Sequence, residues 1–296
     1  LSLIKNDSTI MLLDIKMDNK NIFDLVKSYK PSFIIAPEKY LEDLKFRIHK
    51  NAYEFYNYRI YKTEYNKISL INKNLCLLLP TSGSMGSRRF VMLSKENIKK
   101  NTNSIIKYLK INSRDRAITT MPYGYSYMLS IVNTHLETGA SILLTKNTLA
   151  QKEFWKEYYE NKITSFSGVP YIYEILLKLG LNKIYTSSLN TITQAGGKLD
   201  INSTKQIIKF CKTKKIKFFT MYGQTEASPR MTYLDWKCSN KKIGSIGKAI
   251  QGGKIWLLNK NNKKILKPRE IGELVYKGKN VCLGYSKNFK DLKSRD

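Results

Sequence analysis

The sequence has few residues that could hold a transition metal. Its 296 residues include only two histidines, His49 and His135, and four cysteines at positions 76, 211, 238 and 282. No two cysteines have the spacing of a Cys-x-x-Cys pair. Because a zinc site needs clustered Cys and His ligands, the composition argues against zinc modules. The cysteines are typical of reduced thiols, so we expect a cytoplasmic protein.

Long hydrophobic runs are also missing. No apolar run approaches the ~18 residues of a membrane span, and the longest candidates, such as residues 75–79, have the length of a core strand. Residues 1–9 lack the pattern of a signal peptide. Hydrophobic residues make up 42% of the chain, which excludes a disordered class. The length allows about two domains with a sizeable core.

Acidic residues are scarce beside basic ones. The chain has 52 Lys and Arg against 23 Asp and Glu, a formal net charge of +29. Such an excess is typical of proteins that bind nucleic acid or anionic membranes. However, only nine of the basic residues are arginine, and the lysines are spread along the whole chain. We favour solvated lysines and a compositional bias. A basic nucleic-acid-binding protein is kept as an alternative, although no recognition-helix or stacking motif supports it.

Short apolar segments alternate with amphipathic helical patterns along most of the chain. This rhythm predicts an α/β fold of layered subdomains with mostly parallel sheets. From about Ile243, close-spaced strands follow without helices, which predicts a small antiparallel, β-barrel-like segment at the C-terminal end. We expect two α/β subdomains at residues 1–117 and 118–240, then a small β subdomain at residues 241–296. The strands expected before Ile243 are residues 31–37, 75–79, 117–122, 140–145, 164–170, 190–197 and 218–223.

The loop at residues 81–89, TSGSMGSRR, follows a buried strand of this predicted sheet. Ligands of open α/β sheets collect at the carboxyl ends of strands. Gly83 and Gly86 free the backbone to present N–H groups to an anion, and the hydroxyl and arginine side chains suit phosphate oxygens. The Walker A spacing is absent. Alone, the loop is as compatible with a surface turn as with phosphate binding.

Two later strand-end loops have residue types that suit a nucleotide. In MYGQTEA, Tyr222 can stack on a base, Thr225 can hydrogen-bond a phosphate, and Glu226 is a hard oxygen ligand for Mg²⁺. In TQAGGKL, Gly196 and Gly197 permit the backbone to approach a flat ligand closely. Each loop alone is also compatible with an ordinary polar or glycine turn.

Taken in order, these motifs resemble those of the adenylate-forming superfamily. This group comprises acyl-CoA synthetases, nonribosomal peptide adenylation domains and luciferases. Its phosphate loop, [ST]-S-G-[ST]-[ST]-G-x-P-K-G, is partly matched by TSGSMGSRRF. Its Y-G-x-T-E motif is matched in full by residues 222–226, and its G-E-L and G…GY motifs by residues 272–274 and 278–285. The resemblance covers essentially the whole chain.

The resemblance implies a two-step ligase reaction. A carboxylate attacks the α-phosphate of ATP to give an acyl-adenylate and pyrophosphate, and the acyl group then passes to the thiol of coenzyme A or of a carrier's phosphopantetheine. It implies ATP, Mg²⁺, a small carboxylic acid and, as a candidate partner, an acyl or peptidyl carrier protein. Thr225, Glu226 and Arg89 would act in catalysis, and Glu226 and Thr81 would hold the metal. The other implied residues are Thr81, Ser82, Gly83, Ser84, Gly86 and Arg88 at the phosphates, Gly196, Gly197, Tyr222 and Gly223 at the adenine, and Tyr125 and Ser126 in the acyl pocket.

The sequence also departs from this family pattern. Arg88-Arg89 replaces the usual Pro-Lys, and Met85 replaces a hydroxyl residue and cannot donate a hydrogen bond. A non-catalytic nucleotide-binding homologue is therefore a second alternative. Ser126 stands where amino-acid-activating members place an aspartate, which favours an acyl or aryl acid. The family's Thr-Gly-Asp motif and lysine-bearing C-terminal domain would come after residue 296, so we expect an internal portion of a larger synthetase.

Overall fold

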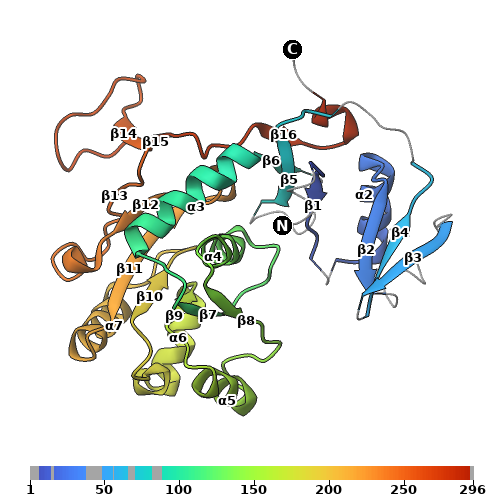
Figure 1. Cartoon of the computed structure of the whole chain (residues 1–296). Coiled ribbons are helices and arrows are strands. Elements are labelled where there is room, and N and C mark those ends of the chain that lie inside the picture. The colour runs from blue at the N-terminus through green and yellow to red at the C-terminus, as the bar shows by residue number, and fades with distance from the viewer. Residues whose placement is uncertain are drawn as a thin grey trace. The chain divides into compact units, whose positions relative to one another are not determined.

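The computed structural model describes residues 7–14, 17–37, 49–55, 57–65, 71–81 and 89–293. The chain folds into two compact units (Figure 1). The first unit comprises Leu1–Lys95 and Leu283–Asp296, and the second unit comprises Glu96–Cys282. The three-part division expected from the sequence stays a prediction.

The first unit contains two small sheets. One has the strand order β1-β5-β6-β16, in which β1 and β5 are parallel and the other pairs are antiparallel. The other is antiparallel with the order β2-β4-β3. Its helix α2 (Asn19–Tyr29) begins after Asp18, whose carboxylate accepts a hydrogen bond from the Asn21 backbone N–H. The strands are β1 (Ile10–Met11), β2 (Phe33–Pro37), β3 (His49–Phe55), β4 (Tyr58–Lys62), β5 (Leu75–Pro80), β6 (Phe90–Ser94) and β16 (Gly284–Ser286).

Buried apolar side chains form the core of the first unit. Leu25 and Tyr29 of α2 pack with Leu78 of β5 and Phe90 of β6. The Tyr29 and Phe90 rings meet edge to face with their centroids 5.5 Å apart. The short helix η5 (Phe289–Leu292) adds Leu292 to this core. The last residues of the chain therefore complete the unit that its first residues begin.

The second unit is built on a seven-stranded sheet with the order β13-β12-β11-β10-β9-β7-β8. The run from β11 to β8 is parallel, and β12 and β13 are antiparallel additions at one edge. Strands and helices alternate along this part of the chain, as parallel connections require. The strands are β7 (Arg116–Ile118), β8 (Ser141–Leu143), β9 (Ser165–Gly168), β10 (Thr191–Gln194), β11 (Lys217–Gly223), β12 (Arg230–Leu234) and β13 (Lys248–Ala249).

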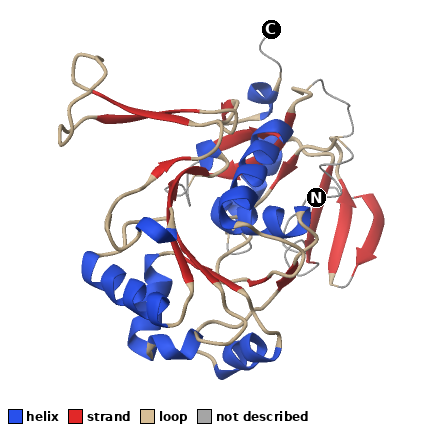
Figure 2. Cartoon of the chain, turned by 60° about the vertical axis from the view of Figure 1, so that its left-hand side comes forward, coloured by secondary structure: helices blue, strands red, loops and turns tan. Residues whose placement is uncertain are grey.

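Helices cover both faces of this sheet (Figure 2). One face packs Phe166, Ile192 and Phe218 against α5, α6 and α7 (Figure 1). The opposite face packs Phe219 and Met221 against α4, with side chains of α3 alongside. The helices are α3 (Lys95–Leu109), α4 (Ser126–Glu137), α5 (Lys152–Glu160), α6 (Pro170–Leu179) and α7 (Ile201–Thr213), with the 3-10 turns η2 (Leu181–Ile184), η3 (Thr225–Ala227) and η4 (Trp236–Cys238).

The mixed α/β fold class predicted from the sequence is confirmed, with both parallel and antiparallel strands. The late strands are divided among three sheets instead of forming one. β13 joins the seven-stranded sheet, β14 (Lys254–Leu258) and β15 (Glu273–Lys277) pair with each other, and β16 joins β6. A strand pairs wherever an edge is open, and spacing along the sequence does not show which edge that is. Among the described residues, no helix has the length and apolar character needed to cross a membrane.

Candidate functional site

Four of the predicted site residues meet at the carboxyl end of the parallel strands in the second unit. Tyr125 and Ser126 lie at the start of α4, Gly196 follows β10, and Thr225 follows β11. The Ser126 and Thr225 hydroxyl oxygens are 3.1 Å apart, and both side chains are buried. Gly196 has φ +80°, and a Cβ there would overlap the Tyr125 hydroxyl. The local geometry at Gly196 therefore requires glycine.

The turn after β11 holds the other predicted nucleotide residues. The Tyr222 ring is 37% exposed, as a ring that could stack on a base would be. The β11–β12 register shifts between Tyr222 and Gly223, and the Gln224 N–H donates to the Pro229 carbonyl at 2.9 Å. Gly197 lies beside Pro170, where a Cβ would come within 3.0 Å of the proline ring. The turn thus presents Tyr222 outward and turns Thr225 inward.

Two buried asparagine side chains donate hydrogen bonds to the backbone carbonyl oxygens of this turn. The Asn101 side-chain amide of α3 donates to the carbonyl oxygens of Ala227 and Arg230, at 3.2 and 2.9 Å. The Asn280 amide donates to the same two oxygens, at 2.6 and 2.8 Å. The side-chain oxygen of Asn280, Oδ1, in turn accepts from the Tyr276 hydroxyl at 2.8 Å. Because buried carbonyls need partners, this asparagine pair fixes the backbone between residues 227 and 230.

We expect Asn280→Ala to lower the free energy of unfolding by about 1–3 kcal/mol, because it removes donors from buried carbonyl oxygens. Asn101→Ala should cost a similar amount, and the double variant should depart from additivity, since both amides serve the same two oxygens. Chemical denaturation of the native protein, the two single variants and the double variant measures these changes in the free energy of unfolding. Asn261→Ala, at an exposed turn, is the matched control and should change stability by less than about 0.5 kcal/mol. Additive effects of the pair would contradict the shared clamp.

Glu226 is the predicted metal ligand. It is partly exposed, and its carbonyl accepts a hydrogen bond from the Cys282 N–H at 2.8 Å. No group of three or more His, Cys, Asp or Glu suited to a metal exists within the described residues. Mg²⁺ at nucleotide sites is commonly held by one or two carboxylates, with substrate phosphates and waters completing its shell. A single carboxylate beside Thr225 fits that mode and does not fit an all-protein metal cage.

The predicted phosphate-loop residues belong to the first unit. Thr81 directly follows β5, and Arg89 directly precedes β6. The Arg89 side chain is exposed, and its guanidinium lies 3.5 Å from the centroid of the Tyr285 ring. The roles assigned to Thr81 and Arg89 stay predictions. The remaining loop residues, Ser82, Gly83, Ser84, Gly86 and Arg88, lie outside the described residues.

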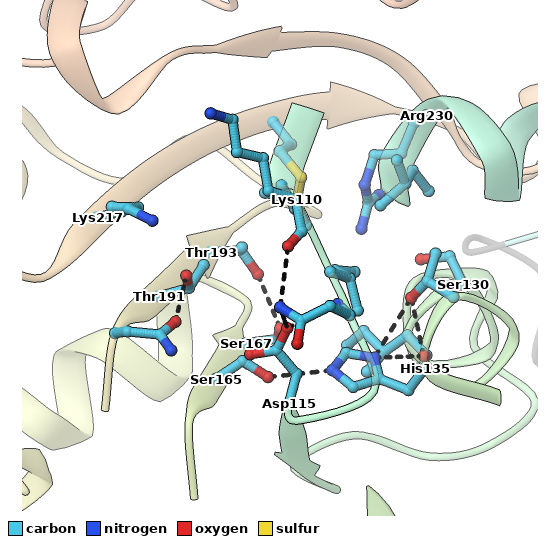
Figure 3. A pocket seen from close by; sticks show the side chains of 18 of the residues that line it. Lys110, Asp115, Ser130, His135, Ser165, Ser167, Thr191, Thr193, Lys217 and Arg230 are labelled. Atoms are coloured by element: carbon cyan, nitrogen blue, oxygen red, sulfur yellow. Dashed lines mark hydrogen bonds between the residues drawn. The ribbon is translucent and has the colours of Figure 1, made fainter. Parts of the chain in front are cut away.

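A cavity of about 140 Å³ lies in the second unit, between the sheet and helices α3 and α4 (Figure 3). Its sheet wall is polar: Ser165 and Ser167 of β9 and Thr191 and Thr193 of β10 face it. Thr193 Oγ1 lies 2.8 Å from the Ser167 hydroxyl and 2.7 Å from the Tyr127 hydroxyl. The cavity is therefore lined by hydroxyl groups that are already linked to one another.

Arg230 of β12 also lines this cavity, and Figure 3 shows its guanidinium across from Lys217. The residue is 3% exposed, and its guanidinium lies 4.0 Å from the centroid of the Tyr127 ring. Burial raises the pKa of Tyr127 and of Tyr108, while the Arg230 charge lowers both. Both phenols therefore stay neutral and do not cancel the charge of Arg230. Its Nε is buried and has no hydrogen-bond partner among the described residues.

His135 lies at the end of the cavity near the amino ends of the strands. Its Nδ1 is 2.9 Å from the Ile131 carbonyl and its Nε2 is 3.2 Å from the Ser165 hydroxyl. Burial, partly offset by the Ile131 carbonyl and by Asp115, lowers the pKa of His135 below its usual 6.5. The imidazole is therefore neutral near pH 7.

We expect the stability of the protein to fall as the pH drops below about 6.5, because the unfolded chain then binds a proton that the folded imidazole resists. The contribution of His135 is complete above pH 6.5 and is lost as the pH falls through the lower folded pKa. Denaturation of the native protein and His135→Gln between pH 7.5 and 5 measures this. His49 is present in both proteins, so its contribution cancels when their pH slopes are compared. Equal pH slopes for the two proteins would overturn the assignment.

Sequence reasoning missed the cavity residues. A signal was present: Ser165-Phe166-Ser167 and Thr191-Ile192-Thr193 alternate polar and apolar side chains on strands that are covered on both faces. Parallel strands buried on both faces usually read as continuous apolar runs. A hydroxyl at every second position therefore marks a polar wall inside the fold. Arg230 has no such local pattern.

Solved structures share this fold. An O-succinylbenzoate coenzyme A synthetase from Bacillus subtilis in complex with AMP superposes with a TM-score of 0.70 at 20% identity, covering 94% of this chain and 56% of that chain. The structure titled as the same Bacillus subtilis enzyme with ATP and magnesium ion gives 0.63 at 23% identity, covering 76% and 46%. At these identities the likeness shows the fold alone.

Proteins related in sequence are named as CoA ligases. The chain is 26% identical over 218 residues to an oxalate–CoA ligase of Saccharomyces cerevisiae, covering 73% of this chain and 39% of the relative. It is 25% identical over 213 residues to a 2-succinylbenzoate–CoA ligase of Geobacillus, covering 72% and 42%. The chain thus spans about two fifths of the length of these relatives. The profile of the AMP-binding enzyme family matches residues 38–286, and the chain belongs to that family.

Proposed function

We propose that this chain is the nucleotide- and acid-binding part of an ATP-dependent acid–thiol ligase. The proposed substrate is a small carboxylic acid, activated as an acyl-adenylate and transferred to coenzyme A. The observation that carries the proposal is the contact between Thr225 of the Tyr-Gly-x-Thr-Glu turn and Ser126 at the start of α4. Membership of the AMP-binding family and relatives named as CoA ligases support it.

Each side chain at this edge of the sheet has a role in the proposed reaction. Tyr222 would stack on the adenine, and the glycine backbone at Gly196 and Gly197 would border it. Thr225 would donate a hydrogen bond from its hydroxyl to the α-phosphate, where charge grows during attack by the carboxylate. Glu226 would hold Mg²⁺, which neutralises charge on the phosphates when bound. Holding acid and ATP together would supply much of the rate enhancement.

The cavity lined by Tyr127 and Arg230 would receive the rest of the acid. Ser126 touches Thr225, and the next residue, Tyr127, lines the cavity together with Arg230. An acid whose carboxylate lay at Thr225 could therefore extend into the cavity. A cavity of about 140 Å³ is close to one of about 150 Å³ that accepts benzene, so a short acid would fill it.

The test is ATP–pyrophosphate exchange by the protein purified as its gene encodes it, with a panel of short aliphatic and aromatic acids. We expect exchange that depends on one class of acid and on Mg²⁺. Trapping with hydroxylamine should then give the hydroxamate of the same acid. ATP binding without exchange, whatever the acid, would instead support a non-catalytic nucleotide-binding homologue. Transfer to coenzyme A and transfer to a carrier protein are separated by adding each acceptor in turn.

A further inference from the structure

The buried charge of Arg230 favours an anionic partner, and the described residues do not supply one. A buried cation is costly unless it is paired and hydrogen-bonded. Arg230 is 3% exposed, and no salt bridge to a carboxylate is present for it in the described part of the chain. Its protein contacts are with neutral phenols, the face of Tyr127 and the side chain of Tyr108. The Nε–H has no acceptor within the part of the chain that the structure describes.

The acidic residue that lines the same cavity is engaged elsewhere. One Asp115 oxygen accepts from the Thr164 hydroxyl at 3.0 Å, and the other accepts from the Asn112 backbone N–H at 2.9 Å. The cavity also contains Lys110 and Lys217, so three cations face one carboxylate. Because His135 is neutral near pH 7, it does not change this balance. The cavity therefore favours a negatively charged group.

The hydroxyl wall adds donors for such a group. Ser130 of α4, Ser167 of β9 and Thr193 of β10 line the cavity together with Arg230. Hydroxyl protons rotate to suit an acceptor, and an arginine fork matches a carboxylate geometrically. An apolar acyl end would leave the Arg230 Nε–H without an acceptor, which disfavours a purely hydrocarbon ligand.

We propose that the cavity receives the far end of a short carboxylic acid that carries a second anionic group, and that Arg230 binds this second group. The inference rests on the proposed function, in which the first carboxylate is the one activated. Arg230 is then the residue that selects a diacid over a monocarboxylic acid of the same length. The volume of about 140 Å³ limits the acid to a few carbons beyond the activated carboxylate.

The experiment is calorimetric binding at 0.15 M salt of saturated diacids with three to six carbons, each against the monocarboxylic acid of equal length. We expect at least one diacid to bind about tenfold or more tightly than its partner, as a charge-assisted hydrogen bond allows. If no diacid binds more tightly than its partner, the inference is overturned. This comparison uses the unaltered protein, so it stays decisive even if a variant fails to fold.

Two variants then assign the preference to Arg230. Arg230→Met should remove the preference, while Arg230→Lys, which keeps a point charge without the fork, should retain part of it. Lys212→Met, at an exposed lysine of α7 that does not line the cavity, is the matched control and should retain the preference. A preference unchanged in Arg230→Met would refute the role of Arg230.

Exchange measurements separate this inference from the proposed function. Diacid preference without any ATP–pyrophosphate exchange would reject the ligase and keep the anion site. Exchange that is as fast with monocarboxylic acids as with diacids, and unaffected by Arg230→Met, would keep the ligase and reject the anion site.

Discussion

Gly223→Ala is expected to lower the free energy of unfolding by at least about 3 kcal/mol, because the new methyl group has no space. A Cβ at Gly223 would overlap the Pro229 carbonyl oxygen and press on the Arg230 backbone. These are backbone atoms that cannot rotate away, and the same oxygen accepts the Gln224 N–H. Chemical denaturation of native and variant proteins measures the loss.

Gly124→Ala is the control for this prediction. Gly124 also lies in a loop at the carboxyl edge of the sheet, but a Cβ there meets nothing within 4 Å, and its φ is outside the left-handed region. Its replacement should change stability by less than about 0.5 kcal/mol or raise it slightly. Equal stabilities of the two variants would show that the turn between β11 and β12 can relax, contrary to the close packing described.

The parallel strands of the second unit could be predicted from the sequence because their signals are local. Each is a short segment that ends in glycine, proline or a hydroxyl residue, and helical patterns lie between most of them. The strands predicted at residues 190–197 and 218–223 correspond to β10 and β11. The glycine and proline punctuation that marks such ends is a property of the chain itself.

The non-local pairings could not be predicted in the same way. β16 contains only the residues Gly284–Ser286 and pairs with β6, nearly two hundred positions earlier. A segment of three residues has too little sequence information to specify so distant a partner strand. β3 and β4 were also missed, because the sequence from His49 to Lys62 is dense in aromatic side chains and has no clear alternation. Its strands depend on pairing with each other and with β2.

The candidate site likewise has a local part, which the sequence could predict, and a non-local part, which it could not. The Tyr-Gly-x-Thr-Glu turn is contiguous in sequence, so its residues could be proposed together. The cavity is assembled from six elements, and Arg230 enters it only because the turn after β11 reverses the chain into β12. A single arginine has no sequence signature for burial. Only the packing of α3 and α4 over the sheet shows that this cation is enclosed.

Thr225→Val is expected to lower the rate constant of ATP–pyrophosphate exchange about a hundredfold, the usual cost of removing one preorganised donor from a developing charge. Valine keeps the shape of threonine and removes only the hydroxyl. Thr225 is buried, so its hydroxyl is held in place, 3.1 Å from that of Ser126. The Michaelis constant for ATP should change much less than the rate constant, because the donor matters most in the transition state.

Ser126→Ala distinguishes this catalytic role from a structural one. It removes the partner of the Thr225 hydroxyl and leaves the hydroxyl itself, so exchange should fall only about tenfold and denaturation should show a similar loss of stability for both variants. If the Ser126–Thr225 contact merely holds α4 against the turn, the two variants should lose exchange equally, since each breaks the same hydrogen bond. A larger kinetic loss in Thr225→Val at equal stability would therefore support a contact between the Thr225 hydroxyl and the phosphate, because both variants lose the same hydrogen bond.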